Sequence, residues 1–205
     1  MEDVKSSPLE CGVAGRALPG FSESGDRHVF QPTREGALIA VVDGLGHGPE
    51  AAAAALEACA MLESNAGENV ISLIKRCHVG LNGMRGVVVS LASFNFRDSL
   101  MTWIGVGNVH GLLLRLDTAM TGGDESLLLR PGVVGSHLPP LHASVLPVFA
   151  GDSLILATDG VQVTFDHSYV KSQPPRKAAE NLLAQYAKGN DDALILIARY
   201  NGMSL

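Results

Sequence analysis

Five aspartates occupy turn positions next to predicted strands, and side chains of this type can bind a metal ion. Asp43 follows the aliphatic run 37–42, Asp159 follows the run 153–158, and a glycine comes directly after each of them. The other three stand beside turn residues or just before the last predicted strand: Asp26, Asp191 and Asp192. Carboxylates that converge at one rim of a sheet repel one another unless a cation neutralises them. The joint pattern therefore favours a metal site at such a rim.

The chemistry of such a site follows from its oxygen ligands. Carboxylates select Mg²⁺ or Mn²⁺ rather than zinc. Two such ions about 3.5–4 Å apart can bind a phosphoryl oxygen and activate a water molecule between them. Asp-Gly is also a common turn dipeptide, and any single one of these aspartates, taken alone, is more often a turn residue than a ligand. Spacing alone leaves both interpretations open.

The predicted elements place these turns at the ends of strands. Helices are predicted over 51–62, 68–81 and 176–187, the first because Pro49 and Glu50 open an alanine-rich stretch. Short β-rich runs between turn residues predict antiparallel strands. These strands cover 37–42, 87–96, 100–106, 109–116, 126–129, 143–149, 153–158 and 193–200. The order predicts an α+β fold, a four-layer α-β-β-α sandwich of two antiparallel sheets flanked by helices.

Composition limits the class of protein. With 205 residues, of which 46% are hydrophobic and 18% charged, the chain is expected to form a single domain over residues 1–205. A net charge of −6 without a basic run argues against nucleic acid as a partner. Residues 1–5 lack the apolar core of a secretory signal, and the apolar runs are far short of the roughly 18 residues of a membrane span. We expect a cytoplasmic protein with no membrane partner, whose three separate cysteines are reduced thiols.

Other chemistries lack a central residue. The sequence has no Gly-x-Ser-x-Gly elbow and no Gly-Lys of a P-loop. Gly105 and Gly107 precede a predicted strand rather than the helix that dinucleotide binding requires. His137 and His142 have no further soft ligands nearby, which argues against a zinc site. Cys77 and Arg85 are too far apart for a cysteine phosphatase loop.

Five segments occur in the order typical of the PPM/PP2C superfamily: 24–26, 40–48, 105–109, 157–161 and 190–194. They most resemble its compact bacterial SpoIIE-like branch, which includes the stressosome phosphatase, and the resemblance spans roughly residues 26–200. It implies a metal-dependent serine/threonine protein phosphatase. In that family a metal-activated water hydrolyses the phosphoester without a phosphoenzyme intermediate.

The resemblance also implies roles for individual residues. Asp43 matches the aspartate that bridges two metal ions around the activated water, and Gly44 matches the glycine whose carbonyl oxygen binds one of them. In the family's late pair of acids the first is the ligand, so Asp191 is favoured over Asp192. We therefore expect two Mn²⁺ or Mg²⁺ ions, held by Asp26, Asp43, Gly44, Asp159 and Asp191.

The chain departs from the eukaryotic branch of the family at two positions. Phe21 stands where an arginine grips phosphate, and Leu45 stands where a general-acid histidine is proposed. His47 is nearby but offset, and a turn residue that orients the loop is its simpler interpretation. By resemblance, the partners would be phosphorylated STAS-domain proteins of a stressosome, which dephosphorylation would reset. A catalytically weak module that docks a signalling partner, or a hydrolase of small phosphoesters, are the alternatives.

Overall fold

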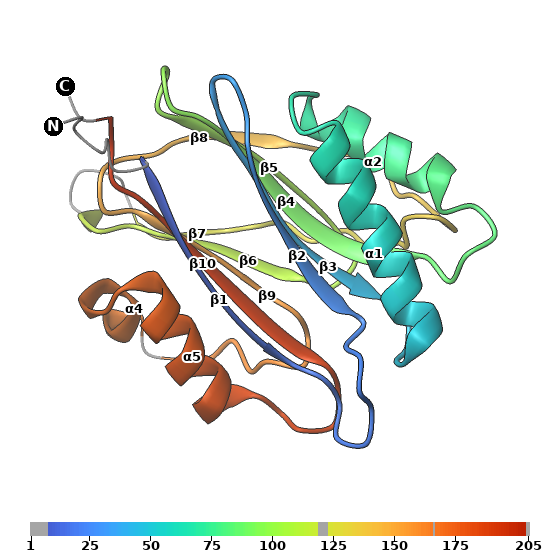
Figure 1. The fold of residues 1–205 in the computed structure, drawn as a ribbon. Helices are drawn as coiled ribbons and strands as arrows, with labels where there is room; N and C mark the ends of the chain where they lie inside the picture. The colour runs from blue at the N-terminus through green and yellow to red at the C-terminus, as the bar shows by residue number, and fades with distance from the viewer. Residues whose placement is uncertain (1–7, 119–122, 166, 204–205) are drawn as a thin grey trace, which may run out of the picture.

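Two antiparallel sheets of five strands lie face to face between helices (Figure 1). The computed structural model describes residues 8–118, 123–165 and 167–203, so residues 1–5, used above to judge a secretory signal, lie outside it. In order across the first sheet the strands are β1 (Leu9–Arg16), β10 (Ala193–Tyr200), β9 (Ser153–Ala157), β6 (His110–Leu114) and β7 (Glu125–Ser126). The second sheet contains, in order, β2 (Asp26–Pro32), β3 (Gly36–Gly44), β4 (Val87–Asn95), β5 (Leu100–Val106) and β8 (Ser144–Pro147).

The helices cover the outer faces of the two sheets. Helices α1 (Pro49–Ser64) and α2 (Val70–Gly80) pack on the second sheet, whereas α5 (Pro175–Tyr186) packs on β1 and β10 of the first, with the short α4 (Ser168–Ser172) beside it (Figure 1). This arrangement confirms the predicted α-β-β-α sandwich. Among the described residues, no helix is both long enough and apolar enough to cross a membrane.

The position of strand β3 explains why its sequence is aliphatic throughout and does not alternate with polar residues. Leu38, Ala40 and Val42 pack towards the helices, while the residues between them face the other sheet. A strand that is buried on both faces has no solvent side to mark with polar residues. The run before Asp43 is therefore buried between the helices and the first sheet, and Asp43 follows it near the end of the strand.

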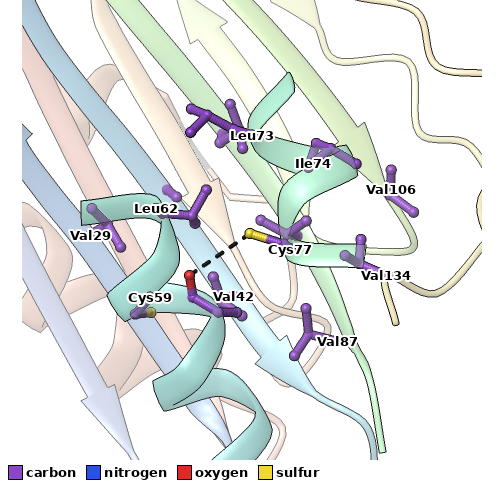
Figure 2. Packing of buried hydrophobic residues seen from close by; sticks show 14 of the residues in the cluster. Val29, Val42, Cys59, Leu62, Leu73, Ile74, Cys77, Val87, Val106 and Val134 are labelled. Atoms are coloured by element: carbon purple, nitrogen blue, oxygen red, sulfur yellow. Dashed lines mark hydrogen bonds between the residues drawn. The ribbon is translucent and has the colours of Figure 1, made fainter. Parts of the chain in front are cut away.

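The layer between α1, α2 and the second sheet is made of aliphatic side chains and thiols (Figure 2). Leu73, Ile74 and Cys77 of α2 lie over Val106 and Val134 in this cluster. Cys77 Sγ donates to the carbonyl oxygen of Ala58, 3.9 Å away, and burial raises the pKa of this thiol to about 11. All three cysteines are free, as expected.

The predicted boundaries differ from the observed ones mainly at element ends. Helix α1 is longer than predicted, because Pro49 begins it, and β7 is shorter than the predicted strand 126–129. Strands β1 and β2 and helix α4 were not predicted individually. Glycines interrupt the β1 sequence, and β2 carries polar residues at the edge of its sheet, so neither shows a strong apolar pattern.

Candidate metal centre

Strand pairing brings two of the predicted ligands together. Asp26 begins β2, Asp43 stands near the end of β3, and the two residues are directly opposite each other in the antiparallel ladder. Residues that are directly opposite present their side chains on the same face of a sheet. One step further, the Gly44 amide donates to the carbonyl oxygen of Gly25 at 3.1 Å, which closes the end of the pair.

The first sheet brings its acids to the same rim. Thr158 and Asp159 follow β9, Asp191 precedes β10, and these two strands are neighbours. The Thr158 hydroxyl accepts a hydrogen bond from the Leu194 amide at 2.9 Å and donates to Asp26 Oδ2 at 2.8 Å. A single buried hydroxyl therefore joins the ends of the two sheets where the carboxylates meet.

The carboxylates lie within one another's electrostatic fields. Burial, together with four neighbouring charges, raises the pKa of Asp43 from 3.8 to about 8; the charges are those of Asp26, Asp159, Asp191 and Asp192. Burial likewise raises the pKa of Asp26 to about 7, although the hydrogen bond from Thr158 opposes this. Without a cation, the cluster holds protons to neutralise its own repulsion. Such an arrangement is typical of a functional site.

The donor set fits a hard divalent cation. Asp26 is only 4% exposed, whereas Asp43, Asp159 and Asp191 are half-buried and open towards solvent. Within the described ranges, no group of three or more Asp, Glu, His or Cys side chains is placed closely enough to hold a metal ion. Oxygen ligands without thiol or imidazole match Mg²⁺ or Mn²⁺.

The two adjacent acids of the late pair have different tasks. Asp192 is buried, and its two carboxylate oxygens accept hydrogen bonds from the amides of Leu18 and Gly25, each at 2.7 Å. It therefore holds the β1–β2 loop in place. Asp191 is half-buried and accepts one bond, from the Asp192 amide at 2.9 Å. This difference supports Asp191 as the ligand of the pair.

Two further side chains hold Asp159 in place, and the sequence assigned neither of them a role, although Asn108 lies in the segment 105–109. Asn108 Nδ2 donates to Asp159 Oδ2 at 2.7 Å, and Lys188 Nζ donates to the Asp159 carbonyl oxygen. Asn108 lies in the connection between β5 and β6, which crosses from one sheet to the other. Gly107-Asn108 was visible in the sequence as a turn, but the contact of Asn108 with Asp159 depends on how the two sheets stack.

The glycines that follow the two Asp-Gly aspartates have steric reasons to be glycine. A Cβ atom on Gly44 would lie 2.1 Å from the carbonyl oxygen of Ala51 in α1. A Cβ atom on Gly160 would lie 1.9 Å from the carbonyl oxygen of Asp192. Both glycines therefore let another backbone segment pass directly against the metal-site turn.

The two positions that depart from the eukaryotic pattern lie in loops beside the site. Phe21 is 40% exposed, and its ring packs against the exposed imidazole of His47 with a centroid distance of 4.7 Å. Leu45, the other departure, is also exposed. The contact with Phe21 favours the interpretation of His47 as a residue that orients the loop.

The α-β-β-α sandwich with aspartates at its meeting sheet ends is the architecture of the metal-dependent PP2C-type phosphatases. Over 180 residues the chain is 27% identical to phosphoserine phosphatase RsbX of Bacillus subtilis (strain 168), covering 87% of each protein. Residues 33–201 match the family described as Stage II sporulation protein E (SpoIIE). The chain belongs to this SpoIIE family.

Solved structures show the same relationship. A chain from a structure of the bacterial stressosome, described as a modular system adapted to control secondary messenger signalling, matches with a TM-score of 0.88 and 29% identity over 93% of this chain and 99% of that one. RsbX in complex with magnesium matches with a TM-score of 0.82 and 25% identity, over 93% and 94% of the two chains. The PP2C domain of SpoIIE from Bacillus subtilis, at 20% identity and a TM-score of 0.75, shares the fold over 95% of this chain and 64% of that one.

The carboxylate cluster predicts how the stability of the metal-free protein depends on pH. The pKa values of Asp26 and Asp43 are raised from 3.8 to about 7 and about 8, so the folded state binds more protons than the unfolded state between those limits. Their contribution to stability is complete below about pH 4 and is lost as the pH rises through 7 to 8. We expect the Tm in EDTA to fall across this range. Asp43→Asn, which removes one titrating charge, should flatten the fall, and an equally steep fall in the variant would contradict this account.

Proposed function

We propose that this protein, as one domain over residues 1–205, is a cytoplasmic phosphatase that hydrolyses phosphoserine or phosphothreonine on STAS-domain proteins. The observation that carries the proposal is the convergence of the predicted aspartates from two sheets at one rim. The likeness to phosphoserine phosphatase RsbX and to a stressosome structure supports the substrate class. Dephosphorylation would reset a bacterial stress-response module.

The residues of the chain divide into ligands and supports. Two Mn²⁺ or Mg²⁺ ions would be held by Asp26, Asp43, Gly44, Asp159 and Asp191. When bound, these ions supply a water nucleophile at neutral pH and neutralise the charge of the phosphoryl oxygens. Thr158 orients Asp26 through its hydroxyl, and Asn108 orients Asp159 through its amide. Supports of this kind keep ligands in place for the metal.

The direct test uses a phosphorylated STAS protein as substrate. The protein is incubated with it in Mn²⁺, in Mg²⁺ and in EDTA, and the loss of phosphate is followed by intact mass spectrometry. We expect the phosphate to be lost with either ion and to remain with EDTA, since the carboxylates alone provide no nucleophile. Hydrolysis that persists in EDTA, or phosphate retained in both metals by a folded protein, would sink the proposal.

A docking module without turnover is the second candidate. The apolar contact between Phe21 and His47, at positions beside the site, favours it because neither side chain can grip phosphate as an arginine does. Manganese-dependent hydrolysis of an aryl phosphate would discard this candidate. If the aryl phosphate were hydrolysed faster than the phosphoprotein, a small phosphoester would instead be the natural substrate.

A further inference from the structure

Arg85 is a cationic side chain held next to the loop that follows the proposed metal ligands. It lies two residues before β4, whose Val87 pairs with Gly44 and whose next residue pairs with Asp43. The Leu45 amide continues this pairing by donating to the carbonyl oxygen of Gly86 at 3.1 Å. Three residues of extended chain span at most about 10 Å, so the Arg85 backbone is close to the Asp43 end of the ladder.

The guanidinium group lies directly against the loop. Arg85 Nη1 is 2.7 Å from the point that a Cβ atom on Gly46 would occupy, and Gly46 has a φ of +84°. The group thus lies over the turn between Leu45 and His47. A larger residue at Gly46 would push the guanidinium away from this position.

Glu50 holds Arg85 there by an exposed ion pair, which a substrate phosphate could replace. Arg85 Nε donates to Glu50 Oε2 at 2.6 Å, and Nη2 completes an ion pair with the same oxygen. The side chains are 47% and 71% exposed, and exposed pairs of this kind contribute little to stability. A phosphate, which accepts two parallel hydrogen bonds from a guanidinium, is a stronger partner than one carboxylate oxygen.

The space beside the pair can admit part of a substrate. Glu50 and Arg85 line a cavity of about 440 Å³ together with Ala53, Gly83 and Met84. A substrate phosphate that approaches a rim of carboxylates is repelled by them, and a nearby cation such as Arg85 offsets part of that repulsion. Lys188, another cation at the rim, is bonded to the backbone carbonyl of Asp159 and serves that turn.

We propose that Arg85 binds the phosphoryl group of the substrate, exchanging Glu50 for it. This inference rests on the proposed phosphatase function. Arg85 would supply the phosphate contact that Phe21 cannot make. Its contact is with the phosphate itself, so the identity of the phosphorylated protein should not alter its contribution.

Steady-state kinetics in Mn²⁺ with two substrates tests this assignment. For Arg85→Ala we expect the KM for a phosphoprotein, the KM for an aryl phosphate and the Ki of inorganic phosphate to rise together, each by on the order of 10-fold to 100-fold. The value of kcat should change far less, because the contact is made in the ground state as well as in the transition state. Arg85→Lys should recover part of the affinity. Glu50→Gln should leave KM equal or lower, since it releases Arg85.

Arg76 on α2 provides a matched control, because it forms an ion pair with Glu68, is as exposed as Arg85 and lies away from the site. Arg76→Ala should leave all three constants unchanged. A rise in KM for the phosphoprotein alone would overturn the inference, because Arg85 would then contact the protein partner rather than phosphate. Unchanged constants in Arg85→Ala would overturn it as well.

Two further measurements keep the inference separate from the proposed function. Turnover by the wild-type protein tests the proposed function, whereas the ratio of KM or Ki between variant and wild type tests the role of Arg85. If there is no turnover, the Kd of inorganic phosphate in Mn²⁺ is measured by calorimetry, and the Kd of the variant is compared with that of the wild type. If Arg85→Ala does not fold, Arg85→Lys and Glu50→Gln decide: a raised Ki in the first with an equal or lower Ki in the second supports phosphate binding, and any other result opposes it.

Discussion

Asp43→Asn is expected to lower the phosphatase activity by on the order of 10³-fold while the protein remains folded, the scale of losing a key electrostatic contact at a reaction centre. Asp43 stands opposite Asp26 in the ladder and lies in the field of the other carboxylates, so it is central to the proposed site. The amide has nearly the shape of the carboxylate but no charge. Since burial and its neighbours raise the pKa of Asp43 to about 8, removing the charge should also stabilise the metal-free protein at pH 8 or above.

Activity and Tm measured on the same samples separate chemistry from folding. Asp98→Asn is the matched control, because Asp98 is an exposed turn acid whose partner is Asn95. It should leave both quantities unchanged. If Asp43→Asn kept most of its metal-dependent activity, the proposed site would be misplaced. If it lost activity only by unfolding, the like-charge explanation of its pKa would be wrong.

The neighbouring acids Asp191 and Asp192 should respond oppositely when each is replaced. Asp191→Asn should lose activity by on the order of 10²-fold to 10³-fold with little change in stability, because it removes a proposed ligand. Asp192→Ala should lower the free energy of unfolding by about 2–5 kcal/mol, because it leaves the amides of Leu18 and Gly25 without their acceptor.

Urea unfolding of the two metal-free variants, with activity measured in parallel, tests this division. Asp192→Asn is the conservative companion, since its side-chain oxygen can keep one of the two bonds, and it should fall between wild type and Asp192→Ala in stability. A stable but inactive Asp192→Ala, beside an active Asp191→Asn, would exchange the roles of the two residues.

The fold could be predicted largely because strand β3 has a simple sequence pattern. The run 37–42 is aliphatic on both faces, so its burial and its end at Asp43 follow from sequence. Strand β1 could not be predicted in the same way, because Gly12 and Gly15 weaken its apolar pattern and its pairing with β10 joins the two ends of the chain. Contacts between residues so far apart in the sequence leave no local sequence pattern.

The candidate site shows the same division. The Asp-Gly turns were visible in the sequence, and the family resemblance assigned them a role that spacing left open. The hydrogen bond from Thr158 to Asp26 and the one from Asn108 to Asp159 were not visible, since each joins segments far apart in the chain. The different roles of Asp191 and Asp192 depend on the position of the β1–β2 loop. Two adjacent aspartates in a sequence do not indicate which of them that loop will contact.

The crowding at Gly44 and Gly160 has a consequence for inactive members of the family. Each glycine is required by a backbone oxygen that passes within about 2 Å of the position of a Cβ atom, and this requirement persists whether or not catalysis occurs. A descendant that had lost catalysis would be free to replace Asp43 or Asp159 but would have to keep both glycines. In comparisons across genomes, the glycine is therefore a marker of ancestry, and only the acid before it separates a working enzyme from a pseudoenzyme.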